Sequence, residues 1–349
     1  MKTSVRLECL RTAVLQLLAS VGVPDEDQTI IADSIEYAHR VGRGTHGLGR
    51  MSLYLTKIEA GLMNPVTAGK LVSDGPVVSV MDAEDGFGQV AATRAMALSI
   101  EKAEHFGVGI CSVRNSNNFG TAGFIAEQAT KRNMIGIVLG NSGPAIAPTG
   151  GHQAILGTNP LGLSFPNPKG DYPISLDMAT SQAARGKIRQ AAKDGLKIPL
   201  GWAIDSSGQP TDDPLKALKG SMVPIGQHKG YGLSLAIDIL AGLLSGAGFA
   251  GDVKPLGDME SVSNYGHFCM AIDVSHFMTL DEWADNIDYL IARIKSAGYA
   301  GQVHIPGENT HRSFRRHNES IEVENTVLES IGAMLFSRSL PCCWDFQAG

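Results

Sequence analysis

The 349-residue sequence has little of what marks several large protein classes. Aromatic residues make up 6%, and the five cysteines include no C-x-x-C pair. No apolar run reaches the roughly 18 residues that a membrane-spanning helix needs. Lys and Arg number 29 against 35 Asp and Glu, and their only basic cluster is the short, interrupted one of Arg312, Arg315 and Arg316. These absences argue against a disulfide-stapled, membrane-spanning or nucleic-acid-binding protein.

The first residues, Met1–Glu8, carry charges where a secretory signal would be apolar. We therefore expect a soluble cytoplasmic protein. Motifs of hydrolytic chemistry are missing as well: neither H-E-x-x-H nor G-x-S-x-G occurs, and the histidines at 228, 267 and 304 stand apart. A metal-dependent hydrolase or lyase thus lacks its ligands, and we expect no metal site.

Glycine, in contrast, is abundant, with 41 residues, which is typical of tight turns and close backbone approaches. Apolar residues at helical spacing predict a hairpin of two helices followed by a third. From Val77 onward, short β-branched runs alternate with longer amphipathic segments, which predicts an α/β fold. The expected helices are 4–22, 25–40, 50–60, 89–106, 120–132, 229–247 and 279–297. The expected strands are 77–81, 108–113, 134–140 and 267–274.

Changes in this pattern divide the chain into four parts. We expect a helical N-terminal region (1–75), an α/β region (76–310), a C-terminal helical segment (311–337) and a disordered tail (338–349), where periodicity is lost. Within the α/β region, residues 141–215 are rich in Gly, Pro, Asn and Asp and predict a loop-rich sheet.

Two strings match the dinucleotide-binding pattern in their letters. Gly42–Gly47 follows a predicted helix, although the pattern requires a strand there. Gly86–Ala91 follows a strand and opens a helix, but Arg114 and Asn115 stand where an acidic residue should hold the ribose. We therefore predict that Gly86–Ala91 binds no cofactor. The alternative role is a glycine turn that packs a helix against a sheet.

His46 and Arg50 lie four residues apart, so one side of a helical first turn can carry both. A guanidinium can hold a carboxylate with two hydrogen bonds, and an imidazole can pass a proton. The nearby cation and the helix N-terminus both favour a neutral imidazole, which helps His46 to act as a base. Tyr54, one turn further on, shares this face. The alternative is that His46 caps a turn and Arg50 pairs with a surface carboxylate.

Four glycine-framed polar segments stand at the ends of apolar runs, where α/β proteins bind ligands. Each is by itself a common turn, but four in one chain favour an enclosed ligand. Lys229, flanked by glycines at a helix start, is suited to a phosphate. The segments are Asn141–Pro144, Gly157–Pro160, Asp177–Ser181 and Gln227–Gly232.

Six motifs, in order, resemble those of the malate/L-lactate dehydrogenase family that is distinct from the Rossmann-type enzymes. This family includes sulfolactate and ureidoglycolate dehydrogenases and a cyclic-imine reductase. The resemblance runs from about residue 5 to about 335 and rests on Thr45–Arg50, Asn115–Gly120, Gly157–Leu161, Asp177–Ser181 with Ala184–Lys187, His228–Leu233 and Ile305–Glu308.

The resemblance implies an NAD(P)-dependent oxidoreductase, with NAD or NADP as its cofactor, a sulfolactate-dehydrogenase-like non-Rossmann fold, and a homodimer. A helical N-terminal part would carry the proton-transfer residues, and a mixed-sheet domain would bind cofactor and substrate. Carried over by position, His46 would be the acid/base and Arg50 would hold the substrate carboxylate, with Tyr54 and Thr158 beside it. The cofactor-lining residues would be Ser142, Asp177, Met178, Ala179, Thr180, Lys229, Gly230, Pro306, Gly307 and Glu308.

Asn118 departs from the family pattern, because many members have His at this catalytic position. Asn cannot exchange a proton near neutral pH, although it can hydrogen-bond a carbonyl oxygen. The proton would then pass through His46. We expect reversible reduction of a small 2-oxo acid; the alternatives are NADPH-dependent reduction of a cyclic 2-imino acid, or a cofactor-binding homologue with impaired catalysis. The sequence leaves open the individual substrate and the choice between NAD and NADP.

Overall fold

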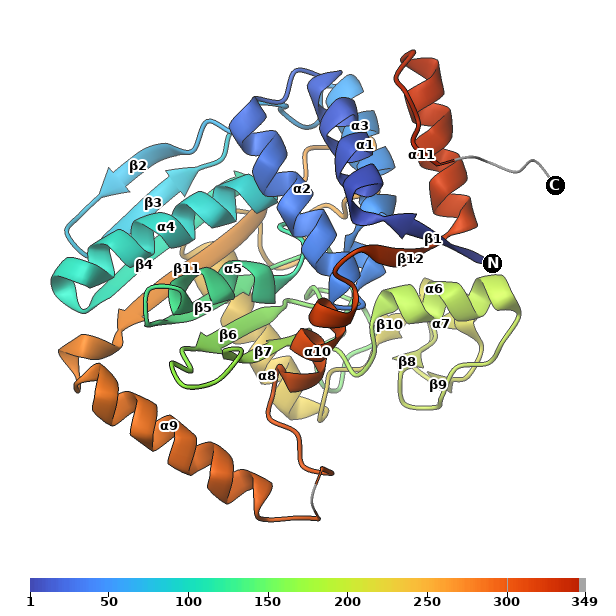
Figure 1. Cartoon of the computed structure of the whole chain (residues 1–349). Coiled ribbons are helices and arrows are strands. Elements are labelled where there is room, and N and C mark those ends of the chain that lie inside the picture. Colours follow the sequence, from blue (N-terminus) through green and yellow to red (C-terminus); the bar gives the residue numbers. More distant parts are fainter. Residues whose placement is uncertain (300, 345–349) are drawn as a thin grey trace.

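A mixed seven-stranded sheet forms the centre of the protein, in the computed structural model that describes residues 1–299 and 301–344 (Figure 1). Only the β3–β4 pair is parallel within this sheet, and its other neighbours are antiparallel. In spatial order its strands are β2 (Lys70–Asp74), β3 (Val78–Asp82), β4 (Val108–Ser116), β11 (Tyr265–Asp273), β5 (Met134–Gly140), β6 (Leu161–Phe165) and β7 (Ile174–Met178). The expected α/β class with a mixed sheet is confirmed.

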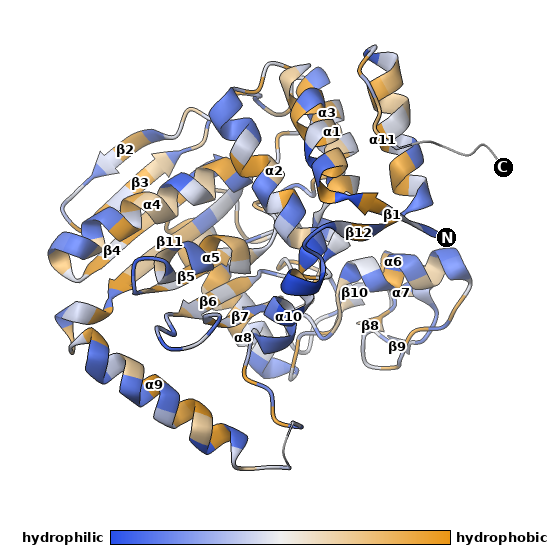
Figure 2. Cartoon of the chain, in the orientation of Figure 1, coloured by the Kyte–Doolittle hydropathy of each residue, from blue (hydrophilic) through white to orange (hydrophobic). Residues whose placement is uncertain are grey.

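Helices cover both faces of this sheet. Helices α4 (Gly88–Phe106) and α5 (Ala122–Thr130) bury many alanines, whose small side chains let them pack closely on the strands. On the other face lies α8 (His228–Ile237), which continues as a π-helical turn, Asp238–Leu243. The single helix expected for 229–247 is therefore two segments. Figure 2 shows the orange, hydrophobic residues concentrated on the inner strands.

A second core lies among the N-terminal helices α1 (Leu7–Ala19), α2 (Asp25–Arg40) and α3 (Met51–Glu59) and the C-terminal helix α11 (Asn325–Ser337). Beside it, β1 (Lys2–Arg6) pairs antiparallel with β12 (Ser320–Glu324). The helical prediction was wrong for residues 4–6, which belong to β1. It was also wrong for 320–324 within the expected helical segment 311–337. In both places a strand forms because it finds a partner more than 300 residues away.

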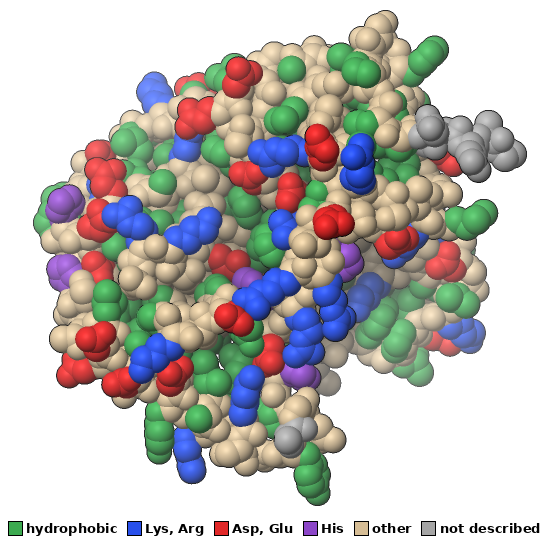
Figure 3. Space-filling view, viewed as in Figure 1, with side chains coloured by type: hydrophobic (Ala, Val, Ile, Leu, Met, Phe, Trp, Pro, Cys, Tyr) green, Lys and Arg blue, Asp and Glu red, His purple; other side chains and the backbone are tan. Residues whose placement is uncertain are grey.

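The remaining elements form a small lobe and two surface helices. The lobe holds α6 (Arg185–Asp194), α7 (Pro214–Lys219) and a three-stranded sheet of β10 (Ser221–Met222), β8 (Ala203–Ile204) and β9 (Pro210–Thr211). Helix α9 (Leu280–Lys295) runs along the rim of the molecule, and α10 (Glu308–Arg316) lies close to α2 and β7 (Figure 1). Charged side chains of both signs are spread over the face in Figure 3.

The segment after α11 packs on the molecule as far as it is described. Arg338 pairs with Glu59, and Leu340 and Trp344 pack against the N-terminal core. Residues 345–349 of the expected tail lie outside the described residues. Among the helices that are described, none is long and apolar enough to cross a membrane.

Gly88 explains the glycine string that follows β3. A Cβ atom at this position would lie 2.0 Å from the carbonyl oxygen of Asn117 and 2.6 Å from the carbonyl carbon of Asn118. Only glycine therefore lets the start of α4 approach the chain that follows β4 so closely. This contact matches the packing role that we gave as the alternative to a dinucleotide site.

Candidate active site

Most of the expected site residues lie at one edge of the central sheet. Because β4 and β5 both run antiparallel to β11, their carboxyl ends meet at this edge. The carboxyl end of β7 and the start of β6 lie there too. The edge therefore collects Asn118 after β4, Ser142 after β5, Thr158 before β6 and the Asp177–Thr180 segment at the end of β7.

Hydrogen bonds join these strand ends directly. The backbone N–H of Thr158 donates to Ser142 Oγ (3.1 Å). The N–H and the hydroxyl of Thr180 both donate to the Thr158 carbonyl (2.9 and 3.0 Å). Asn159 links the group to α8, because its Nδ2 donates to the Ser234 carbonyl (2.9 Å). The structure thus brings Ser142, Thr158 and Thr180 together.

The start of α8 packs onto the same edge. A Cβ atom at Gly230 would lie 2.3 Å from the Ile225 carbonyl oxygen and 2.8 Å from that of Thr180, so glycine is required there. Lys229 precedes it in the first turn and is exposed. Within the described chain its ammonium makes no ion pair, so it is free to meet an anion.

His46 and Arg50 belong to two successive 3₁₀ turns, Gly44–His46 and Leu48–Arg50, rather than to the first turn of α3. Arg50 Nε donates to the Thr45 carbonyl (2.8 Å), which joins the two turns. Among the residues that the structure describes, no carboxylate pairs with Arg50. The alternative in which Arg50 pairs with a surface carboxylate is therefore not observed, and the outer guanidinium nitrogens remain free for a ligand.

The pKa of the His46 imidazole is far below the ordinary value for histidine. Burial lowers its pKa to about 3, and the positive charges of Arg50 and Arg43 act in the same direction. Nδ1 lies 3.2 Å from Thr45 Oγ1, its hydrogen-bond partner. His46 is therefore neutral at ordinary pH and able to accept a proton.

His39 positions the loop that carries His46, a role the sequence did not suggest. Its Nε2 accepts the backbone N–H of Leu48 (2.9 Å). Burial lowers the pKa of His39 to about 4, which keeps the ring neutral and able to accept this bond. A Cβ atom at Gly47 would lie 2.3 Å from the same nitrogen, so the glycine makes room for the ring.

Arg43 is a second positioning residue that we did not foresee. Its guanidinium pairs with Asp177 Oδ1 (2.7 Å) and donates to the Asp177 carbonyl (2.8 Å). The other carboxylate oxygen accepts the N–H of Gly123 (2.9 Å). Burial raises the pKa of Asp177, and the Arg43 charge opposes that rise. This pair ties the loop before His46 to the end of β7; the only sequence signal was a charged residue between two glycines.

Tyr54 and Asn118 belong to a buried polar region. Tyr54 is fully buried, and its hydroxyl accepts Gln89 Nε2 (2.8 Å). Asn118 Oδ1 accepts the N–H of Gly120 (3.1 Å). Four buried polar atoms nearby have no hydrogen-bond partner among the described residues: Ser34 Oγ, Gln89 Oε1, Asn117 Oδ1 and Thr121 Oγ1. Because buried polar atoms are normally satisfied, their clustering marks a place that a polar ligand or water would complete.

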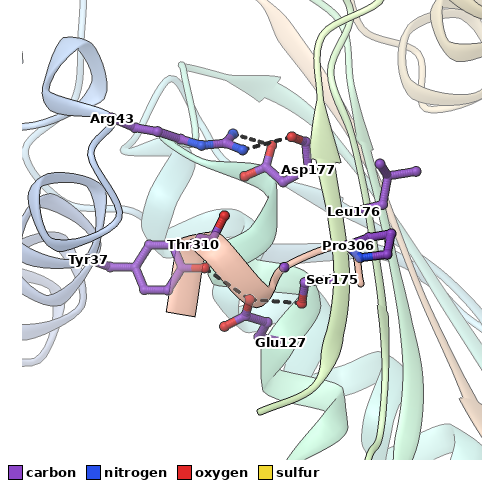
Figure 4. Close-up of a pocket in the computed structure, with 9 residues that line it drawn as sticks. Tyr37, Arg43, Glu127, Ser175, Leu176, Asp177, Pro306 and Thr310 are labelled. Atoms are coloured by element: carbon purple, nitrogen blue, oxygen red, sulfur yellow. Dashed lines mark hydrogen bonds and ion pairs between the residues drawn. The ribbon is translucent and has the colours of Figure 1, made fainter. Parts of the chain in front are cut away.

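A cavity of about 180 Å³ lies between α2, α5, β7 and α10 (Figure 4). Asp177, Pro306 and Gly307 line it, so the structure brings these three expected residues together. Glu127 Oε1 accepts the hydroxyls of Tyr37 (3.0 Å) and Ser175 (2.9 Å) at its wall. Glu308 lies outside this cavity and faces a second hollow with Arg312. No described group of His, Cys, Asp and Glu could hold a metal ion.

The sheet edge, the start of α8 and the His46–Arg50 loop thus belong to an α/β protein with a mixed sheet. A family model described as malate/L-lactate dehydrogenase matches residues 5–332. The chain therefore belongs to the malate/L-lactate dehydrogenase family, as the six motifs indicated.

Individual relatives agree with this assignment. The chain is 40% identical over 320 residues to the L-sulfolactate dehydrogenase of Methanocaldococcus jannaschii, covering 91% of this chain and 92% of the relative. It is 42% identical over 292 residues to the malate dehydrogenase of Pyrococcus abyssi, covering 81% and 80%. The solved sulfolactate dehydrogenase structure from M. jannaschii superposes with a TM-score of 0.91 at 38% identity, covering 97% and 98% of the two chains. This similarity confirms the expected sulfolactate-dehydrogenase-like fold.

A reductase of a cyclic imine shares the architecture as well. The Δ1-piperideine-2-carboxylate reductase of Pseudomonas syringae pv. tomato superposes with a TM-score of 0.85 at 26% identity, covering 95% of this chain and 99% of that one. The same fold therefore occurs in dehydrogenases and in an imine reductase.

Proposed function

We propose that the protein reversibly reduces a small 2-oxo acid to the 2-hydroxy acid with NADH or NADPH. The observation that carries the proposal is the Arg50 guanidinium, free of any described carboxylate and set one turn from a neutral His46. This is an arrangement for holding a carboxylate and moving a proton beside it. Membership of the dehydrogenase family supports it.

The residues present fit a dinucleotide. Lys229, which makes no ion pair with any described residue, offers a cation for a phosphate. The strand ends beside it carry the other expected residues, which are Ser142, Met178, Ala179, Thr180 and Gly230. Asp177, Pro306 and Gly307 line the adjoining cavity. When bound, the nicotinamide supplies or takes the hydride; the protein binds and orients it.

Arg50 would hold the substrate carboxylate with its outer nitrogens, which places the reacting carbon beside His46. Tyr54 and Thr158 are the further residues that we assign to the substrate pocket. The Tyr54 oxygen already accepts Gln89 Nε2. Its own proton is therefore directed away from Gln89.

His46 would take the hydroxyl proton during oxidation and return it during reduction. The low pKa suits the first role, because the ring is already neutral. In the second role, a carboxylate bound to Arg50 would offset the positive charge that depresses the His46 pKa. Substrate binding would thus help His46 to become protonated when a proton is needed.

Reduction of a cyclic 2-imino acid is the second candidate, favoured by the structural similarity to the piperideine-carboxylate reductase. Such a substrate has a carboxylate for Arg50 in the same place. A third candidate is a cofactor-binding homologue with impaired catalysis, because Asn118 cannot move a proton.

We also propose that the protein forms a homodimer. Helix α8 and the π-helical turn after it expose several large apolar side chains, and α9 exposes more. Large apolar side chains exposed in such numbers favour an interaction surface. The exposed residues are Leu233, Leu235, Ile239, Leu243, Leu244, Tyr289, Leu290 and Ile294.

The test is the oxidation of NADH and of NADPH, followed at 340 nm, in the presence of oxaloacetate, pyruvate, sulfopyruvate or a cyclic 2-imino acid. We expect turnover with at least one 2-oxo acid. Turnover with only the imine would select the second candidate. Tight binding of the cofactor without turnover of any of them would select the third.

A further inference from the structure

The second hollow, beside α10, has a volume of about 300 Å³ and is lined by one acidic residue, one tyrosine and three arginines. Its lining residues are Tyr172, Glu308, Arg312, Arg315 and Arg316. Figure 3 shows Lys and Arg side chains gathered near the middle of this face, over α10, beside a depression in the surface. The activity proposed above does not use these arginines.

Positive charge exceeds negative charge around this hollow. The cationic groups are Arg312, Arg315, Arg316 and Lys295, and the carboxylates are Glu308 and Asp171. Four cations against two carboxylates leave an excess of two positive charges. Arg316 is exposed and makes no ion pair with any described residue. Such an excess, presented by guanidinium forks, suits a phosphate dianion.

Glu308 is the group that would favour a ribose without a phosphate, because a carboxylate can accept hydrogen bonds from both free hydroxyls of the ribose. Its oxygens are already engaged by the protein. Oε2 accepts the N–H of Ile305 (3.1 Å), and Lys295 and Arg312 lie within 3.4 Å. The Ile305 hydrogen bond and the Lys295 charge lower the pKa of Glu308, so it stays ionised and bound to these partners.

The hollow adjoins the cavity assigned to the cofactor. Gly307 and Thr310 of the α10 segment line the cavity, whereas Glu308 and Arg312 line the hollow. Tyr172 lines the hollow, and its ring stacks on that of His311, with centroids 5.4 Å apart and planes 12° apart. Because Gly307 and Glu308 are neighbours in the chain, a ligand in the cavity lies close to the hollow and its arginines.

We propose that the hollow binds the phosphate on the adenosine ribose of NADP, so that Arg315 and Arg316 make the protein prefer NADP(H) to NAD(H). The inference rests on the proposed function, because it assumes a dinucleotide at the α10 cavity. It assigns these arginines as specificity-determining residues outside the catalytic centre.

The test is isothermal titration of the full chain, in a phosphate-free buffer, with adenosine 2′,5′-bisphosphate and with adenosine 5′-monophosphate. We expect the bisphosphate to bind at least tenfold more tightly, about 1.4 kcal/mol. Arg316→Gln should reduce this ratio to below threefold while thermal unfolding stays unchanged. Arg315→Gln is the second variant. The matched control is Arg132→Gln, at the opposite edge of the sheet just before β5, which should keep the wild-type ratio.

Equal affinity for the two nucleotides in the wild type, or an unchanged ratio in both arginine variants, would overturn the inference and leave the proposed function standing. Inorganic phosphate that competes as tightly as the bisphosphate would identify a general anion site and also overturn it. If neither nucleotide binds, and neither NADH nor NADPH binds, both the inference and the proposed function fail.

Discussion

At the scale of single residues, the His46 imidazole combines a low pKa with the role in proton transfer that we propose for it. Burial and two arginines keep the ring neutral in the free protein. Oxidation then needs no change of its protonation state before substrate binds. Reduction needs the protonated ring, whose population falls tenfold for each pH unit above a pKa of about 3. The two directions should therefore depend on pH differently.

Arg50→Lys should damage the enzyme although it keeps the charge. One ammonium cannot reproduce the two parallel hydrogen bonds of a guanidinium, and it also loses the Nε bond to the Thr45 carbonyl. We expect kcat/KM for the acid substrate to fall by more than tenfold, with NAD(P)H affinity unchanged. Steady-state kinetics and a fluorescence titration of NAD(P)H separate the two effects. Equal losses in both would place Arg50 outside the substrate site.

Asn118→His tests whether the missing histidine limits this protein. Asn118 is partly exposed, and within the described chain its side chain makes one hydrogen bond, which Oδ1 accepts from the N–H of Gly120. A second proton-carrying group should raise kcat or move the pH optimum toward neutrality. If kcat and the pH optimum are the same in Asn118→His as in an active wild type, position 118 has no part in proton transfer. Asn118→Gln, which adds bulk without a titratable group, is the control.

At the scale of elements, the loop of residues 44–50 depends on contacts that lie outside it. His39 on α2 holds the Leu48 N–H, and Arg43 holds Asp177 at the end of β7. This loop is therefore fixed between a helix and the sheet edge. The sequence predicted α2 and the strand ends, but not these bonds.

His39 also makes stability depend on pH. Its pKa is about 4 in the folded protein, against the ordinary value of 6.5 for a histidine in an unfolded chain, so the unfolded chain binds a proton first as the pH falls. This contribution is fully present above pH 6.5 and is lost as the pH falls toward 4. Denaturant unfolding should show a shallower decline over this range in His39→Gln, whose side-chain oxygen can still accept the Leu48 N–H. His39→Ala should lower the free energy of unfolding by about 1–3 kcal/mol at pH 7. A His39→Gln slope equal to that of the wild type would contradict the account.

Sequence patterns predicted most of the helices and strands, because amphipathic spacing and β-branched runs are properties of a single segment. Helix α2, for example, begins at Asp25 directly after Pro24, as the sequence predicted. Strand β1 was missed because Lys2–Arg6 pairs with Ser320–Glu324, and no local pattern records a partner so distant. The site shows the same division. His46 and Arg50 were chosen as candidates from their spacing, although they lie in two 3₁₀ turns rather than on one helical turn. Arg43 acquires its role only through Asp177, 134 residues away.

At the scale of the whole molecule, the apolar surface of α8 and α9 leads to a prediction about assembly. Leu243 is half exposed in the π-helical turn, and Leu244 beside it is more exposed. Leu243→Glu would place a charge in the proposed dimer interface and should convert the dimer to a monomer. Analytical ultracentrifugation over a range of protein concentrations measures this change. Phe106→Glu, an equally exposed apolar position at the end of α4, is the control.

A wild-type protein that stays monomeric at all concentrations would contradict the dimer proposal. So would a dimer that Leu243→Glu leaves intact, or one that the Phe106 control disrupts as strongly. None of these results would bear on the chemistry of the His46 site.

The most direct test of the account is kcat/KM for 2-oxo acid reduction from pH 5 to pH 8, in the wild type and in His46→Asn. We predict that the wild-type value falls tenfold per pH unit across this range, because the protonated ring is the donor and its pKa lies near 3. We predict that His46→Asn loses at least about a hundredfold in rate, the usual contribution of a positioned general acid, while it still binds NAD(P)H. Near-wild-type turnover by His46→Asn would contradict the assignment of the proton to His46, and a wild-type profile that is flat up to a break near pH 6.5 would contradict the lowered pKa.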